Sequence, residues 1–183
     1  ALANFPGWTG RSGVVPNGAF IEYWPTLVDS KYIKELIHID DKVIEVLPTN
    51  QLGLEEKYYQ KVPYENPTLE IGEVREDFFG RIYGTRSGDK GGCANLGVWA
   101  KTEDAYSFLF DFLTVKKLKE LLPDLESFEI DRYELPNIFS LNFYVHGILQ
   151  EGVSSSTRMD GQAKSLGEYL RAKKINFPLQ LLK

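Results

Sequence analysis

The sequence has little cysteine: Cys93 is the only one among 183 residues, so no internal disulfide can form. A fold that does not depend on oxidation suits a reducing compartment, and we expect a cytoplasmic protein. No stretch approaches the ~20 apolar residues of a transmembrane helix, and residues 1–7 lack the basic and then apolar order of a signal peptide. These absences predict a protein that neither crosses a membrane nor relies on disulfides.

Positive charge and methionine are also scarce. Asp and Glu (26) outnumber Lys and Arg (21), which gives a formal net charge of −5, and no basic run is longer than Lys173-Lys174. Nucleic-acid binding requires a clustered Lys/Arg surface, so we expect no nucleic-acid partner. The only methionine is Met159 and the sequence begins at Ala1, so we expect it to be a piece of a longer protein.

The apolar pattern divides the chain into three parts. Residues 1–47 are rich in β-forming side chains, and strands are predicted over 19–24, 32–39 and 42–46, the last two as a hairpin. Residues 48–76 lose the apolar period and are punctuated by Pro and Gly, which predicts a linker. Residues 77–183 alternate strand and helix signals, which predicts one folded domain.

Within this third part, the predicted order of elements is β-β-α-β-α-β-α. Thr102 and Thr114 are predicted N-caps of two helices, and Pro123 ends the second. The other predicted elements are strands over 78–83, 96–101, 128–133 and 155–159, a helix over 163–172 and an extended tail over 175–182. Residues 137–149 fit a helical face and an alternating strand, and the cap-like Asn137 favours the helix. Helices on one face of a mostly antiparallel sheet make an α+β two-layer sandwich.

Residues 86–95 form the strongest candidate for a functional loop, because a hairpin turn needs far fewer than ten residues. Three of them are glycines, which let backbone N–H groups converge on an anion. Arg86 and Lys90 would add positive charge. The alternative is a structural loop, in which Asp89 pairs with either cation and the glycines serve positive-φ positions.

Polar side chains further along the chain are additional candidates. In a helix, Asn142 and His146 share a face at i, i+4 spacing and could face a pocket with Glu134 at its rim. The alternative is a capped core helix with a hydrogen-bonded histidine. Arg158 lies in a hydroxyl-rich loop that could join Arg86 at an anion site, or could be plainly solvated.

Neither a metal nor a cofactor is predicted. No second ligand stands at metal-binding spacing from His146, which argues against a zinc site. A Cys93–His146 pair would make a nucleophile, but a lone cysteine beside a strand is more often a small buried hydrophobe. No catalytic residue is assigned.

Three stretches carry a family resemblance. They are TRSGDKGGCANLGVWAK (85–101), RYELPNIFSLNFYVHGILQEGVSSSTRMD (132–160) and GQAKSLGEYLRA (161–172). They resemble the C-terminal domain of the acyclic terpene utilisation protein A (AtuA) family, whose loop runs Arg-Ser-Gly-Asp-Lys-Gly, two variable positions, then Ala-Asn. Residues 86–91, Ala94 and Asn95 fit this loop, and Cys93 stands at a variable position.

The resemblance implies a ferredoxin-like domain preceded by the β-rich end of a larger N-terminal domain. It also implies a link to the catabolism of acyclic terpenes or branched acyl-CoA compounds. We therefore expect a site for a small anionic metabolite or acyl-CoA, formed by Arg86, Ser87, Gly88, Asp89, Lys90, Gly91, Asn95, Asn137, Asn142, His146 and Arg158. The alternative is a non-catalytic docking module with a structural loop. In either case we expect a homo-oligomer that packs against its own upstream domain.

Overall fold

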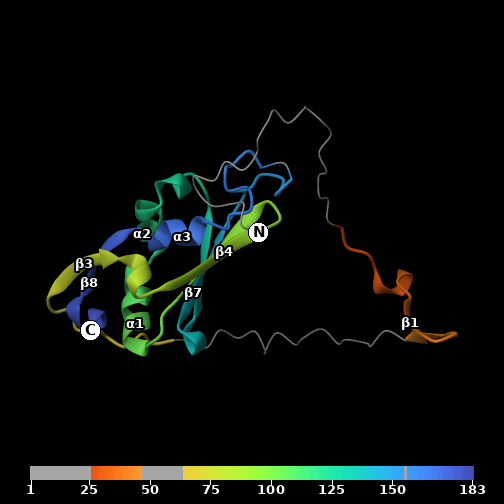
Figure 1. Cartoon of the computed structure of the whole chain (residues 1–183), viewed down its shortest axis with the longest axis horizontal. Coiled ribbons are helices and arrows are strands. Elements are labelled where there is room, and N and C mark those ends of the chain that lie inside the picture. The colour runs from red at the N-terminus through yellow and green to blue at the C-terminus, as the bar shows by residue number, and fades with distance from the viewer. Residues whose placement is uncertain (1–25, 47–63, 155) are drawn as a thin grey trace. The chain divides into compact units, whose positions relative to one another are not determined.

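Figure 1 shows the computed structural model of the chain, which describes residues 26–46, 64–154 and 156–183. The chain divides into two compact units, whose described parts lie within residues 24–64 and within residues 65–183. The predicted strand over 19–24 and most of the predicted linker lie outside the described residues.

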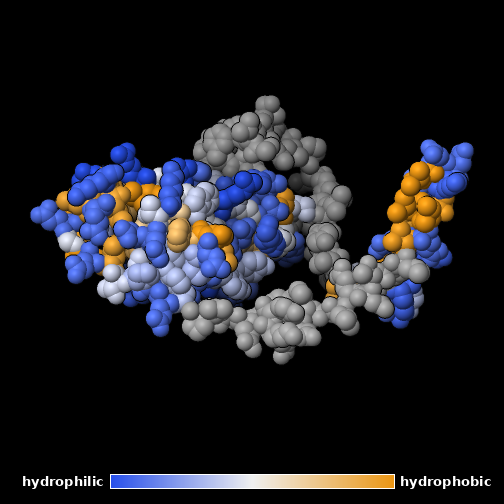
Figure 2. Space-filling model, turned by 90° about the horizontal axis from the view of Figure 1, so that it is seen from below, coloured by the Kyte–Doolittle hydropathy of each residue, from blue (hydrophilic) through white to orange (hydrophobic). Residues whose placement is uncertain are grey.

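The smaller unit contains the predicted hairpin. After a 3₁₀ turn at Ser30–Tyr32, strands β1 (Glu35–Ile39) and β2 (Lys42–Val46) pair antiparallel through a turn in which Asp40 has a φ of 51°. Ile37 lies opposite Ile44, and these two side chains are 46% and 50% exposed. Figure 2 shows apolar side chains gathered along the hairpin. A two-stranded hairpin with exposed isoleucines has no core of its own.

The larger unit is built on a four-stranded antiparallel sheet. Its strands are β4 (Gly84–Lys90), β5 (Cys93–Trp99), β6 (Ile130–Leu135) and β7 (Ser140–Val145), in the spatial order β4-β5-β7-β6. Because β5 and β6 both run antiparallel to β7, they are parallel to each other with β7 between them. Their connection contains α1 (Glu103–Phe112) and α2 (Val115–Leu121). This split βαβ arrangement confirms the predicted ferredoxin-like α+β class.

Local signals set the ends of these helices. The Thr102 side chain accepts a hydrogen bond from the backbone N–H of Ala105, and Thr114 caps α2 through Lys117 in the same way. Pro123 follows α2 and opens a 3₁₀ turn, η4 (Pro123–Leu125). Among the described residues, no helix is long and apolar enough to cross a membrane.

The helices cover one face of the sheet (Figure 1). Alternate residues of the two central strands are fully buried beneath them: Ala94, Leu96, Val98, Leu141, Phe143 and Val145. Tyr106 and Leu109 of α1 and Leu118 of α2 face this layer. The third helix, α3 (Leu166–Arg171), packs on the same side, where a Cβ on Gly167 would meet the hydroxyl of Thr85. Burying such apolar side chains supplies about 2 kcal/mol each before entropy is counted.

A separate two-stranded ribbon joins β3 (Val74–Phe78) to β8 (Lys174–Pro178), and a 3₁₀ turn, η6 (Leu179–Leu182), follows. β3 begins inside the range predicted as linker. The Asn66 side chain also donates to the carbonyl of Ser107 in α1, so described residues ahead of 77 pack with the larger unit. The predicted strand over 78–83 is wrong: η3 (Phe79–Arg81), a 3₁₀ turn, stands between β3 and β4.

Two further predictions are wrong. The favoured helix over 137–149 is instead η5 (Pro136–Ile138) followed by the strand β7, because pairing with β5 and β6 satisfies its backbone on both sides. Residues 156–159 form no strand, and the helix predicted over 163–172 is confined to α3.

Gly92 in the hairpin turn and Gly88 within β4 provide a matched pair of substitutions. A Cβ at Gly92 would overlap the backbone oxygen of Gln150, whereas a Cβ at Gly88 meets nothing within 4 Å. We expect Gly92→Ala to destabilise the protein by about 1–3 kcal/mol. Gly88→Ala should be neutral or stabilising by up to about 1 kcal/mol. Urea unfolding of both variants measures the difference, and equal effects would contradict this packing.

Alkaline unfolding tests the buried Tyr83, whose hydroxyl donates to the carbonyl of Ala105 at 2.9 Å. Burial raises the pKa of Tyr83 above its ordinary value of 10.0, so above that pH the unfolded chain loses a proton that the folded chain keeps. Stability from Tyr83 is therefore full below pH 10.0 and falls as pH rises. Tyr83→Phe should cost about 1 kcal/mol near neutral pH. This cost should shrink in denaturant titrations at alkaline pH, and a constant cost would contradict the assignment.

Candidate functional site

The predicted ten-residue loop over 86–95 is a tight hairpin, so this prediction is wrong. β4 continues to Lys90 and β5 begins at Cys93, which pair directly across the turn at Gly91 and Gly92. Gly91 has a φ of 63°, and a positive φ at the first of two turn positions is the pattern of a type II′ turn. The backbone N–H of Leu149 donates to the Gly92 carbonyl at 2.9 Å, which ties the turn to the following loop.

The strand conformation sends alternate side chains of the motif to opposite faces of the sheet. Ser87 and Asp89 pair with Leu96 and Ala94, which are buried under the helices, so both lie on the helix-covered face. There the Ser87 hydroxyl accepts a hydrogen bond from the backbone N–H of Gly167 in α3, at 2.9 Å. Ser87 thus joins the hairpin to α3, and it meets Arg86 only at the edge of β4, where both line a small pocket with Lys164 and Glu168.

The other side chains of the motif lie on the face that no described helix covers. We call this surface the helix-free face. It consists of the outward residues of the four strands and the residue after β7: Gly84, Arg86, Gly88 and Lys90; Cys93, Asn95, Gly97 and Trp99; Asp131, Tyr133 and Leu135; Ser140, Asn142, Tyr144 and His146.

Gly97 lies at the centre of this face. Gly97 pairs with Arg86 on one side and with Asn142 on the other, so these two polar side chains flank a position without a side chain. The amide of Asn95 donates to the Oδ1 of Asn142 at 3.4 Å. Arg86, Asn95 and Asn142 are therefore neighbours on the sheet.

A polar cluster occupies the end of the face nearest the hairpin turn. The Nε2 of His146 lies 2.8 Å from the Oδ2 of Asp131, and the Tyr133 hydroxyl donates to the same oxygen at 3.5 Å. The ring of Tyr144 meets the imidazole edge-on, with centroids 4.9 Å apart. His146 is thus oriented by a carboxylate and a ring, an arrangement that holds an imidazole in a defined position.

Cys93 lies beside this cluster. Its Sγ accepts a hydrogen bond from the backbone N–H of Gly147 at 3.4 Å. The neighbouring Cys93 thiol also raises the pKa of Tyr144 above its ordinary value. Because the imidazole of His146 is turned towards Asp131, the geometry favours a structural role for Cys93 over a nucleophilic pair.

The opposite end of the face is apolar. There Trp99 and Leu135 are 40% and 42% exposed, and the ring of Tyr133, at the centre opposite Asn142, is 52% exposed. With strands ~4.8 Å apart and ~3.4 Å per residue, the four-stranded face measures roughly 14 by 20 Å. It therefore combines a cationic and amide centre with an aromatic end.

The remaining predicted residues lie at the edge of this face or away from it. Lys90 is exposed, and its Nζ donates to the backbone oxygen of Asp89 at 3.1 Å, not to the carboxylate. Asn137 is exposed in η5, at the apolar end of the sheet. Arg158 lines a pocket beside α3 with Tyr169, away from Arg86. Glu134 faces the helices, paired with Arg132 at 2.8 Å.

Sequence reasoning missed Asp131, Tyr133, Tyr144 and Trp99. The signal that could have found them is the period of two in residues 130–135 and 140–145, which places them on the face of Asn142. Within the ranges that the structure describes, no group of three or more His, Cys, Asp or Glu side chains is placed to hold a metal ion.

Comparison with known proteins agrees with this architecture. Residues 80–176, more than half of the chain, match the AtuA ferredoxin-like domain. No curated protein and no solved structure matches the chain. The matched range begins just before β4 and ends within β8, so it contains the whole four-stranded sheet and its helices. The chain therefore belongs to the AtuA ferredoxin-like domain family.

Proposed function

We propose that the helix-free face binds a small anionic metabolite of the acyl-CoA class, within a protein that serves the catabolism of acyclic terpenes or branched acyl-CoA compounds. The observation that carries this proposal is the convergence of Arg86, Asn95, Asn142 and His146 on one surface. Asn137, Arg158, Ser87 and Asp89 are no longer part of the proposed site, because they lie away from this surface or face the helices.

Arg86 is the anchor for the anionic group. A guanidinium presents donors in a planar fork that matches a carboxylate or phosphate. Arg86 is exposed and stands beside Gly97, where the missing side chain lets a ligand approach the strand backbone. The amides of Asn95 and Asn142 lie next to it and supply donors and acceptors of neutral charge.

The aromatic end of the face suits the acyl part of such a ligand. Trp99 lies two positions along β5 from Gly97 and on the same face, so an apolar chain can continue from Arg86 onto the indole. The dimensions also favour a metabolite, since roughly 300 Å² is well below the ~800 Å² per partner of a standard protein interface.

Calorimetry of the full-length protein with CoA esters tests the proposal. We expect Arg86→Ala to weaken binding about tenfold or more, because it removes a charge-assisted contact worth roughly 1.5–3 kcal/mol. Arg75→Ala is the matched control, because Arg75 is also exposed but lies on β3, outside the sheet. No binding by the full-length protein, or equal affinity of Arg86→Ala and wild type, would refute the proposal.

A second candidate function is docking of a protein partner, favoured by the exposed Trp99, Tyr133 and Leu135. Aromatic residues and Arg are enriched at interface centres. On this reading the domain forms a homo-oligomer through the helix-free face. Tyr133→Asp should then lower the mass measured by light scattering, whereas Ile71→Asp, at a 62% exposed position, should leave it unchanged. The same mass for wild type and Tyr133→Asp would remove this candidate.

Two related proposals concern the setting of the domain. The exposed isoleucines of the β1–β2 hairpin form the kind of apolar surface that packs against further protein, and we assign it to an upstream domain. With Cys93 free, the fold needs no oxidising compartment, and we place the protein in the cytoplasm.

A further inference from the structure

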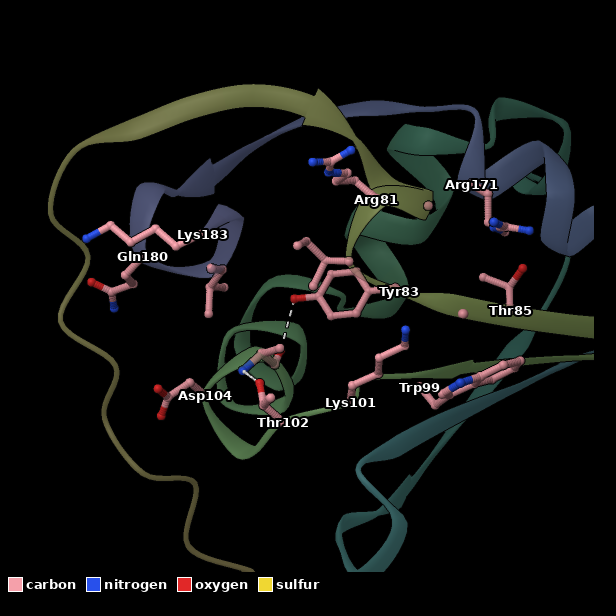
Figure 3. A pocket seen from close by; sticks show the side chains of 15 residues that line it. Arg81, Tyr83, Thr85, Trp99, Lys101, Thr102, Asp104, Arg171, Gln180 and Lys183 are labelled. Carbon is pink, nitrogen blue, oxygen red and sulfur yellow. Dashed lines mark hydrogen bonds between the residues drawn. The ribbon is translucent and has the colours of Figure 1, made fainter.

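A concave site lies at the other end of β4, away from the hairpin turn. It is a pocket of about 720 Å³ between η3, the ends of β4 and β5, the first turn of α1, the last residue of α3 and the C-terminal η6 (Figure 3). Small-molecule sites commonly fall in the range of ~300–1,000 Å³. The sequence predicts no binding residue in this pocket, because its lining comes from four separate segments of the chain, 80–85, 99–105, 171 and 180–183.

The pocket concentrates positive charge. Four cationic side chains line it, Arg81, Lys101, Arg171 and Lys183, against one carboxylate, Asp104. In Figure 3, Arg81, Lys101 and Arg171 lie around the ring of Tyr83, and Lys183 lies further out with its amine directed away from the ring. This excess stands out in a chain with a formal net charge of −5, and a local cationic wall attracts multiply charged anions.

The fold holds parts of this wall in place. Gly80 leaves room for the Arg171 side chain, since a Cβ there would lie 2.9 Å from the Cβ and Nε of Arg171. Glu168, one turn earlier in α3, pairs with Arg171 at 3.1 Å and is more than half exposed. Tyr83 forms the floor of the pocket. Its hydroxyl donates to the Ala105 carbonyl and is therefore not available to donate to a ligand.

Trp99 gives the pocket an aromatic wall. Its indole lies over Gly84, where a Cβ would overlap the ring, so the absence of a side chain at 84 is what admits it. A ligand with an anionic end and an apolar or planar part would therefore meet both kinds of surface. Arg86 does not line this pocket, so the site is separate from the anchor of the proposed function.

We propose that this pocket binds a phosphate-bearing metabolite with two or more negative charges, such as an organic diphosphate. Arg81, Lys101, Arg171 and Lys183 neutralise the phosphates, and Trp99 contacts the organic part. A single carboxylate would use little of this charge, so the site discriminates polyanions from simple organic acids.

Calorimetry of the full chain with pyrophosphate tests the site, with acetate as the singly charged comparison. We expect saturable one-to-one binding of pyrophosphate that weakens as salt is raised. Arg171→Gln and Lys101→Gln should each weaken it about tenfold, the equivalent of one charged contact. Lys116→Gln is the control, because Lys116 is exposed on α2 and outside the pocket. Arg171 ends α3 and Lys101 follows β5. Because the two variants change different elements, a folding defect in one of them does not decide the result.

Asp104→Asn tests the opposite effect, a gain in affinity for pyrophosphate. Removing the only carboxylate of the pocket should tighten pyrophosphate binding several-fold, since it removes a repulsion. Weaker binding by Asp104→Asn, or wild-type affinity in both cation variants, would overturn the proposal. Arg171 and Lys101 lie outside the helix-free face, so loss of pyrophosphate binding in Arg171→Gln and Lys101→Gln tells this site apart from the face that carries Arg86.

Discussion

The two-residue turn at Gly91 and Gly92 sets the register of β4 against β5, and the rest of the larger unit follows from that register. A shift by one residue would exchange the faces of every side chain in β4. In the observed register, Ser87 reaches the backbone of Gly167 under α3, while Arg86 stands on the other side of the sheet beside Gly97. The turn is itself held by the loop after β7, through Leu149 and the close approach of Gln150 to Gly92. Residues 86–95 thus serve two purposes: Ser87 stabilises the packing of α3, and Arg86 lies on the exposed face of the sheet.

β4 also explains why two concave or open sites lie on one small domain. It occupies the sheet edge next to β5, while β8 pairs with β3 in a separate ribbon. The start of β4 therefore borders a cation-lined pocket closed by η3, α3 and η6, and its middle borders the helix-free face. Trp99 belongs to both, since it lines the pocket and ends the apolar part of the face. The edge strand β4 thus places the Trp99 ring, the Arg86 guanidinium and the pocket one after another along its length.

Local signals predict much of this fold, and non-local pairing decides the remainder. The caps at Thr102 and Thr114, the hairpin over 35–46 and the α+β class follow from neighbouring residues, and the structure agrees. The segment 86–95 resembles a loop because glycine and charge are poor strand formers, yet pairing with β5 overrides that preference. Residues 137–149 fit both periods, and the presence of strands on each side selects β7. Arg86, Asn95, Asn142 and His146 could be found from residue type, whereas the pocket could not, because its cations meet only after folding.

Both the fold and the proposed site depend on residues 86 and 87 lying on opposite faces of a paired strand. Maleimide labelling of Arg86→Cys and Ser87→Cys, each with Cys93→Ser in the full chain, measures this directly, since no other thiol is present. We expect rapid labelling at 86 and labelling roughly tenfold slower at 87, where α3 covers the strand, with equal rates once the chain is unfolded. Equal rates in the folded protein would show that this segment is a loop and not a paired strand.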